Sequence, residues 1–414
     1  MKRVATLLLA TLAAVPLAAE DFFDDLDRSL TWSSADAQTR ARLSGTLDLE
    51  GYRFTQPAPG LIDAGGGALF NPRLTTFLDV QAGAKIYVFA QTRLDRGFDP
   101  ATDPLQVRLD EVALRFTPFE DARLNLQVGR FATVVGNWVQ RHGSWDNPFV
   151  TAPLVYENLT GLWDALPVRS AAMLLDWAHV EPPLAAGQPA NDKYLRLPVI
   201  WGPSYTTGAA VFGEWGAVTY AAEVKNASLS SRPGVWDDLD RLFQQPTVSA
   251  RLAWRPSPMW NVGLSASTGG YLTESSSAVL PGGYGWRDYR ETVLAQDASF
   301  AWHHFQAWAE VFETRFAVPL VQDVSTVGYY LELKYRLTPR FSAAVRWNQQ
   351  TFSDVLDSAG QPRPWSPNLW RLDLAPAFRF TPHTQLKFQY SLEHASVGPR
   401  TYSHWGAVQW VLRY

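Results

Sequence analysis

The sequence predicts an all-β chain that closes into a transmembrane, antiparallel up-and-down β-barrel of sixteen strands. Segments of about ten residues that alternate apolar with polar side chains recur along the chain, and successive side chains of a strand point to opposite faces. After residue 19 there is no run of about 18 uninterrupted apolar residues, so a membrane crossing must use strands. An unpaired strand edge is costly in hydrocarbon, and the first strand should therefore pair with the last.

Residues 1–19 have the pattern of a cleaved secretory signal peptide. Lys2 and Arg3 precede an apolar stretch from Val4 to Val15, and small residues follow before Glu20. Removal of these two cations takes the formal net charge from −4 to −6. The chain contains no cysteine, so the exported fold has to hold together without disulfides. We expect residues 20–40 to be a short periplasmic N-terminal segment and residues 41–414 to form the barrel.

Sixteen segments carry the period-two pattern. They are residues 41–53, 73–81, 85–95, 107–117, 123–131, 204–213, 217–226, 247–255, 261–271, 290–302, 305–316, 325–337, 341–352, 369–380, 385–395 and 403–414.

The spacers between these segments alternate between short and long. Three of the short ones contain a Thr-Pro pair, at residues 117–118, 338–339 and 381–382, and proline belongs at turns because it cannot donate to a strand ladder. The long ones are rich in glycine, proline, serine and aspartate. Tight turns on one side and long loops on the other are typical of outer-membrane barrels, and an even strand number puts both termini on the turn side, in the periplasm.

The last strand ends the chain on an aromatic residue. Trp410, Leu412 and Tyr414 share one face, whereas Gln409 and Arg413 share the other. Such a strand resembles the C-terminal assembly signal of bacterial outer-membrane barrels. The resemblance implies that the barrel assembly machinery recognises these three residues.

Taken together, the signal, the hairpins with Thr-Pro turns and the aromatic terminus resemble Gram-negative outer-membrane porins. The run from Asn125 to Phe131, followed by a long spacer, is similar to the phosphate-selective group of those porins. The resemblance implies a water-filled channel in the cell outer membrane for passive diffusion of small hydrophilic solutes or ions, a homotrimer surrounded by outer-membrane lipid, and neither enzymatic activity nor a cofactor or metal. Nucleic acid is excluded as a partner because no clustered basic excess is present.

Alternation also predicts which side chains face the water of the lumen. The predicted lumen-facing set includes Arg115, Arg251, Glu332, Lys334, Arg346, Arg371 and Lys387. Over all sixteen segments the predicted lumen charges are close to balance, which does not favour phosphate selectivity.

The spacer at residues 132–203 is far longer than an ordinary connection. It carries several large aromatic residues, among them Trp138 and Tyr156, too much apolar surface for a solvated coil. We expect it to fold into the lumen and to constrict the pore. The candidate constriction charges are Arg141, His142, Asp146, Glu157 and Asp164; the alternative is that these charges form salt bridges that pin the loop to the barrel wall.

Two other functions remain open from the sequence. His142 and Ser144 share the His-x-Ser spacing of the outer-membrane phospholipase family, so a barrel hydrolase of phospholipase type is one alternative. The other is an adhesion or assembly barrel that uses its long loops and transports nothing.

Overall fold

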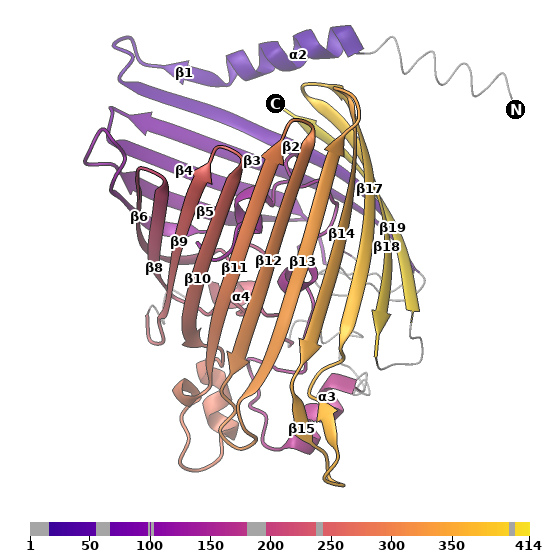
Figure 1. Ribbon diagram of the computed structural model, residues 1–414. Coiled ribbons are helices and arrows are strands. Elements are labelled where there is room, and N and C mark those ends of the chain that lie inside the picture. Colours follow the sequence, from indigo (N-terminus) through magenta and orange to yellow (C-terminus); the bar gives the residue numbers. More distant parts are fainter. Residues whose placement is uncertain are drawn as a thin grey trace, which may run out of the picture.

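The structure, a computed structural model, describes residues 16–54, 67–97, 100, 103–179, 196–236, 243–396 and 402–414. Over these residues sixteen long strands form one closed antiparallel barrel (Figure 1). Each strand pairs with its neighbours along the chain, and the last closes on the first, from Arg413 opposite Thr46 to Trp405 opposite Phe54. The predicted fold class and strand number are confirmed.

The barrel strands are β2 (Thr39–Phe54), β3 (Ala68–Ala82), β4 (Ile86–Asp95), β5 (Gln106–Phe116), β6 (Asn125–Phe131), β7 (Thr206–Trp215), β8 (Val218–Lys225), β9 (Thr247–Ser257), β10 (Trp260–Gly270), β11 (Arg290–Trp302), β12 (Phe305–Phe316), β13 (Val324–Arg336), β14 (Phe341–Phe352), β17 (Leu369–Thr381), β18 (Thr384–Ala395) and β19 (Tyr402–Arg413).

The remaining elements precede the barrel or belong to the loops between its strands. The helix α2 (Pro16–Ser29) and the short strand β1 (Thr31–Ser33) precede the barrel, whereas α3 (Ala171–His179), α4 (Pro233–Trp236) and the hairpin of β15 (Asp354–Leu356) and β16 (Pro362–Pro364) belong to long loops. Four 3₁₀ turns complete the described elements: η1 (Trp138–Arg141), η2 (Leu154–Tyr156), η5 (Glu274–Val279) and η6 (Trp286–Asp288).

Tight turns gather at one end of the barrel and long loops at the other (Figure 1). The β7–β8 connection is Gly216-Ala217, where Gly216 has a φ of +58°, a conformation that glycine adopts without steric cost. His303 and His304 form the equally short β11–β12 turn. The loop end carries α3 and β15 (Figure 1).

The helix α2 lies across the turn end and is fastened to the β17–β18 turn (Figure 1). The ring of His383 stacks on Phe23 at 5.5 Å, and its Nε2 lies 2.9 Å from an Asp24 carboxylate oxygen. Residues 1–15 lie outside the described residues, so the signal-peptide prediction falls mostly there. Among the described residues no helix is both long and apolar enough to span a membrane.

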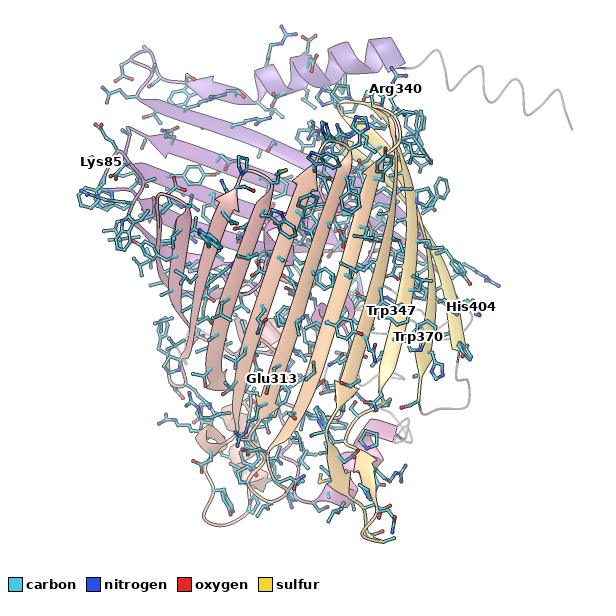
Figure 2. All side chains as sticks on the ribbon, viewed as in Figure 1. Lys85, Glu313, Arg340, Trp347, Trp370 and His404 are labelled. Atoms are coloured by element: carbon cyan, nitrogen blue, oxygen red, sulfur yellow. The ribbon has the colours of Figure 1, made fainter. Side chains whose placement is uncertain are left out.

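Side chains sort by face as the alternation predicts. Outward side chains include Leu252, Trp254 and Phe388, each about half exposed, and aromatic residues such as Trp347 and Trp370 stack on the outer surface (Figure 2). Inward side chains are mostly polar, and many of them are fully buried. Something other than water therefore covers much of the lumen wall.

Candidate functional site

The loop between β6 and β7 enters the barrel and packs on the inner wall. Its aromatic and aliphatic side chains, including Trp138 and Tyr156, form a buried cluster with Val293 and Ala295 of β11 and Phe312 of β12. These three strand residues are apolar at positions that face the lumen, where many other wall positions carry polar groups. They form the apolar seat that the loop covers, which removes its aromatic surface from water.

Wall side chains accept hydrogen bonds from the backbone of this irregular loop. The carboxylate of Glu310 accepts from the backbone N–H groups of Asn137 and Trp138, and also from the Tyr156 hydroxyl at 2.7 Å. Gln389 accepts from the next such pair, Val150 (2.7 Å) and Thr151 (3.2 Å). A buried backbone without regular structure needs such partners, and here the barrel supplies them.

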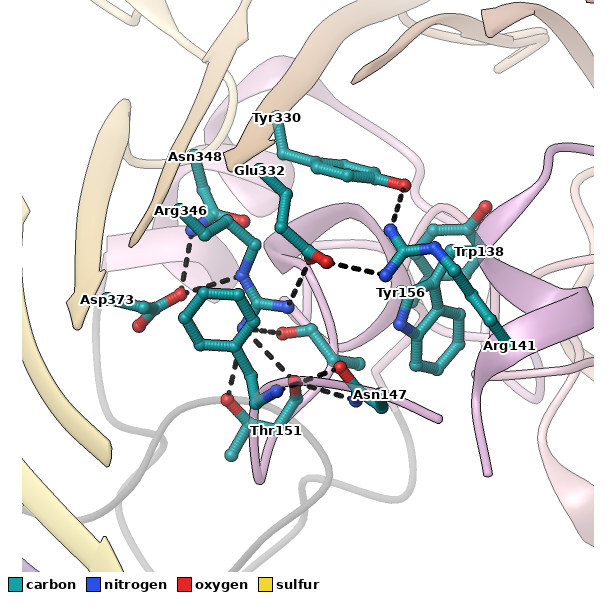
Figure 3. Close-up of polar contacts among 12 residues, drawn as sticks. Trp138, Arg141, Asn147, Thr151, Tyr156, Tyr330, Glu332, Arg346, Asn348 and Asp373 are labelled. Atoms are coloured by element: carbon teal, nitrogen blue, oxygen red, sulfur yellow. Dashed lines mark hydrogen bonds and ion pairs between the residues drawn. The ribbon is translucent and has the colours of Figure 1, made fainter. Parts of the chain in front are cut away.

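Wall cations bind the carbonyl groups of the same loop. Lys387 Nζ donates to the carbonyls of Ser144 (2.6 Å), Asn147 (3.0 Å) and Phe149 (3.3 Å). The guanidinium of Arg346 donates to the Thr151 carbonyl at 3.0 Å and to the Asp373 carboxylate at 2.9 Å (Figure 3). Donors and acceptors of the wall thus fix residues 133–158 along β8 and β10 to β18.

Arg141 and Glu157 form salt bridges to the barrel wall, as in the alternative in which such bridges pin the loop. Arg141 donates to Glu332 at 2.6 Å and to the Tyr330 hydroxyl at 3.2 Å (Figure 3), and its side chain is only 12% exposed. Glu157 pairs with Arg371, and although burial raises the pKa of Glu157, the charge of Arg371 opposes that shift. Both charges are used to hold the loop and are largely shielded from a passing solute.

The other two acidic candidates lie apart. Asp164 pairs with Arg232 of the next long loop at 2.8 Å, and burial raises the pKa of Asp164 to about 6. Asp146 is exposed, near the turn end of the barrel. The structure therefore does not bring the five predicted constriction charges together in one ring.

His142 bonds to groups other than Ser144. Its Nδ1 lies 2.5 Å from the Val139 carbonyl and its Nε2 lies 2.6 Å from the Tyr205 hydroxyl. The Ser144 hydroxyl has no hydrogen-bond partner among the described residues. No His–Ser pair is formed, so the geometry gives no support to the hydrolase alternative. Among the described residues no cluster of three potential metal ligands occurs.

A row of paired charges lies on the inner face of β2 to β5. Arg73 pairs with Asp48 and Glu50, Arg93 with Asp110 and Arg108 with Asp95, at 2.7 to 2.9 Å. The arginine side chains are 22%, 19% and 14% exposed, whereas each paired carboxylate is at most 5% exposed. In each pair the arginine is the more exposed partner.

A strict period of two along β5 would place Arg108 and Asp110 on the outer face of the barrel. Gln91 stands opposite Glu111 and Thr92 opposite Leu109, so Asp110 is an extra residue in β5. This β-bulge turns both Asp110 and Glu111 inward and shifts Arg108 to the same side. The adjacent charges Asp110 and Glu111 were the signal in the sequence, since one of them would otherwise face lipid.

The predicted lumen-facing residues lie as follows. Arg251 pairs with Asp297 at 2.7 Å, and Arg115 donates to Gln127 at 3.0 Å. Glu332, Arg346, Arg371 and Lys387 contact the loop as described above. Lys334 lines a cavity at the turn end, described below.

No protein-family model matches this sequence, and no curated protein matches it. Solved outer-membrane structures do resemble the fold. The outer membrane channel DcaP of Acinetobacter baumannii aligns with a TM-score of 0.58 at 9% identity, over 92% of this chain and 99% of that chain. Salmonella typhi OmpF, solved with daunomycin, aligns at 0.55 and 11% over 92% and 100%. The anion-selective porin from Comamonas acidovorans aligns at 0.53 and 10% over 91% and 100%.

Proposed function

We propose that this chain is an outer-membrane porin through which small hydrophilic solutes diffuse passively, with a preference for anions. The porin-like barrel and the similarity to DcaP, OmpF and an anion-selective porin support the channel and its place in the outer membrane. The phosphate selectivity suggested by Asn125–Phe131 is not part of the proposal. The homotrimer remains a prediction. Chemical cross-linking in native membranes would measure the number of subunits.

The observation that carries the anion preference is the asymmetry of the ion pairs on β3 to β5. The near balance of the predicted lumen charges says little about ion selectivity, because a charge acts on a passing ion mainly where water reaches it. Arg73, Arg93 and Arg108 are the more exposed partners, and their carboxylates are almost fully buried. A rim of fixed positive charge attracts anions and repels cations.

The experiment is a reversal potential across a planar bilayer with a KCl gradient. Below about 0.1 M salt the Debye length is about 10 Å or more, so lumen charges act on ions with little screening. We expect the wild-type potential to have the sign of chloride selectivity, and the double variant Arg73→Gln/Arg93→Gln to shift it toward potassium.

Arg123→Gln is the matched control. Arg123 is a half-exposed arginine in the β5–β6 turn, 3.6 Å from Asp121, so its loss removes one positive charge outside the lumen, compared with two inside it in the double variant. It should leave the reversal potential unchanged. A potassium-selective wild type would overturn the anion preference, and a barrel that inserts without any conductance would favour the adhesion alternative.

A further inference from the structure

A second feature of the lumen lies at the turn end, away from the arginines of β3 to β5. A cavity there is walled by Lys334 and Arg336 of β13 on one side and by Arg379 of β17 on the other. Trp145, Asn147 and Pro148 of the lumen loop lie over it. Its lining therefore combines four strands, β13, β14, β17 and β18, with the part of the loop that Lys387 holds in place.

The floor of the cavity consists of small side chains. Lys334 stands opposite Ala344, which stands opposite Ala375; one pair nearer the turn, Arg336 stands opposite Ser342, which stands opposite Ala377. Larger side chains at these four floor positions would fill the space between the cationic walls. Phe149 of the loop packs on Ala344 and Ala375, and the small side chains of Ser342 and Ala377 leave room for a ligand of a few heavy atoms.

The protein compensates the positive charge of the cavity only in part, through the nearby carboxylate of Asp146. Lys334, Arg336 and Arg379 form no ion pair with a carboxylate in the described part of the chain. The two acidic groups in electrostatic range of Lys334 are Glu332, which Arg141 and Arg346 already hold, and the exposed Asp146. Arg340 and Lys387 also line the cavity, and Lys387 is bonded to loop carbonyls. The cations around the void repel one another, and an anion between them would relieve that repulsion.

Trp145 adds a fixed wall to the cavity. The guanidinium carbon of Arg413 lies 4.0 Å from its ring centroid, and that of Arg379 lies 5.0 Å away. These cation–π contacts limit the movement of Arg379, and a guanidinium held in place loses less freedom when it binds an oxyanion.

We propose that this cavity is a binding site for a small multivalent oxyanion, held between Lys334, Arg336 and Arg379. Guanidinium groups bind carboxylate and phosphate oxygens in pairs, and the three cations match a ligand with at least two negative charges. Inorganic phosphate and a short dicarboxylate share this chemistry. The inference deepens the proposed function, since it adds a binding step at the periplasmic mouth of an anion channel.

The test is isothermal titration calorimetry on the detergent-solubilised barrel at low salt, with inorganic phosphate and succinate as separate probes. This readout needs no ion flux, so it can succeed or fail independently of the channel proposal. We expect wild type to bind at least one probe, and the double variant Arg336→Gln/Arg379→Gln to bind it at least about tenfold more weakly, because two charge-assisted hydrogen-bond donors are lost. Binding of only one of the two probes would identify the ligand class as phosphate or as dicarboxylate.

Two further variants separate a built site from general attraction. Ala377→Leu keeps every charge but fills the floor, and should weaken binding as strongly as the loss of the cations. Lys85→Gln removes an exposed cation at the same end of the barrel, on another side from Arg340 in Figure 2, and should leave binding unchanged. The proposal is overturned if wild type binds neither probe, if Ala377→Leu binds like wild type, or if Lys85→Gln weakens binding equally.

Discussion

Among single side chains, His142 connects the lumen loop to the wall of β4. The Val139 carbonyl can only accept, so Nδ1 carries the proton and Nε2 accepts from the Tyr205 hydroxyl, which in turn accepts from Gln91 at 3.2 Å. The neutral imidazole satisfies both bonds. Burial, together with the charges of Arg93 and Arg73, lowers the pKa of His142 to about 4, although the Val139 carbonyl and Asp110 oppose the shift.

Acid should therefore loosen the loop at this residue. When the loop is detached from the wall, its histidine has a pKa of about 6.5. The contribution of His142 to the free energy of packing the loop on the wall is therefore complete above pH 6.5 and is lost as the pH falls toward 4. Below pH 4 it changes little. Hydrogen exchange of loop amides should show less protection at pH 4.5 than at pH 7. His142→Gln, which cannot titrate, should lose this part of the pH dependence.

The comparison with the variant also removes the effect of other groups. Asp164 and Glu157 have raised pKa values, so their protonation in acid works in the opposite direction and is common to both proteins. Identical pH profiles for wild type and His142→Gln would show that His142 does not control docking.

At the scale of elements, the seam between β19 and β2 depends on one glycine. The backbones of Gly45 and Tyr414 exchange two hydrogen bonds of 3.1 Å, and the tyrosine ring lies over the glycine. A Cβ atom on Gly45 would stand 2.6 Å from the Thr75 carbonyl oxygen and 2.7 Å from the Tyr414 hydroxyl oxygen. The predicted assembly signal therefore has a structural partner in the first strand.

Gly45→Ala should weaken barrel closure. Overpacking costs about 1–3 kcal/mol, and here one of the clashing atoms belongs to the backbone of β3 and cannot rotate away. We expect a lower temperature for loss of the compact form in heat-modifiability gels, and less barrel in the membrane. Gly51→Ala is the control in the same strand, because its Cβ would meet a single side-chain carbon at 3.3 Å. Equal losses in both variants would contradict the role of the seam.

The strands were largely predictable from sequence, and the exceptions have physical causes. The period of two placed β12 at 305–316, as observed. The start of β3 was predicted at 73, whereas it begins at Ala68, because Pro72 resembles a strand end. Pro72 is tolerated since β4 pairs with β3 only from Leu74 onward, so its missing N–H has no partner to lose.

The contacts of the lumen loop were not predictable in the same way. Val150 and its acceptor Gln389 are 239 residues apart, and no local pattern links them. The sequence did predict that the loop had to be covered, because of its aromatic content. It could not show that Arg141 and Glu157 would be used for pinning, since that depends on which strand lies opposite.

For the molecule as a whole, the barrel and its lumen loop should be separable. Deletion of residues 140–160 leaves every strand ladder intact, and the wall groups that it exposes, such as Lys387 and Glu332, can be hydrated by lumen water. We expect the variant to stay heat-modifiable, to show a higher single-channel conductance and to admit larger solutes. Unchanged conductance and solute cutoff would mean that the narrowest section lies elsewhere.

The pinning of the loop also bears on how steady the current through one channel is over time. Moving one elementary charge through 100 mV supplies about 2.3 kcal/mol, whereas each hydrogen bond to a charged group contributes about 1.5–3 kcal/mol, and Lys387, Arg346 and Glu310 make several of them to the loop. An applied voltage should therefore not dislodge the loop. Recordings should show long openings at a single current level, with little flicker as the potential is raised.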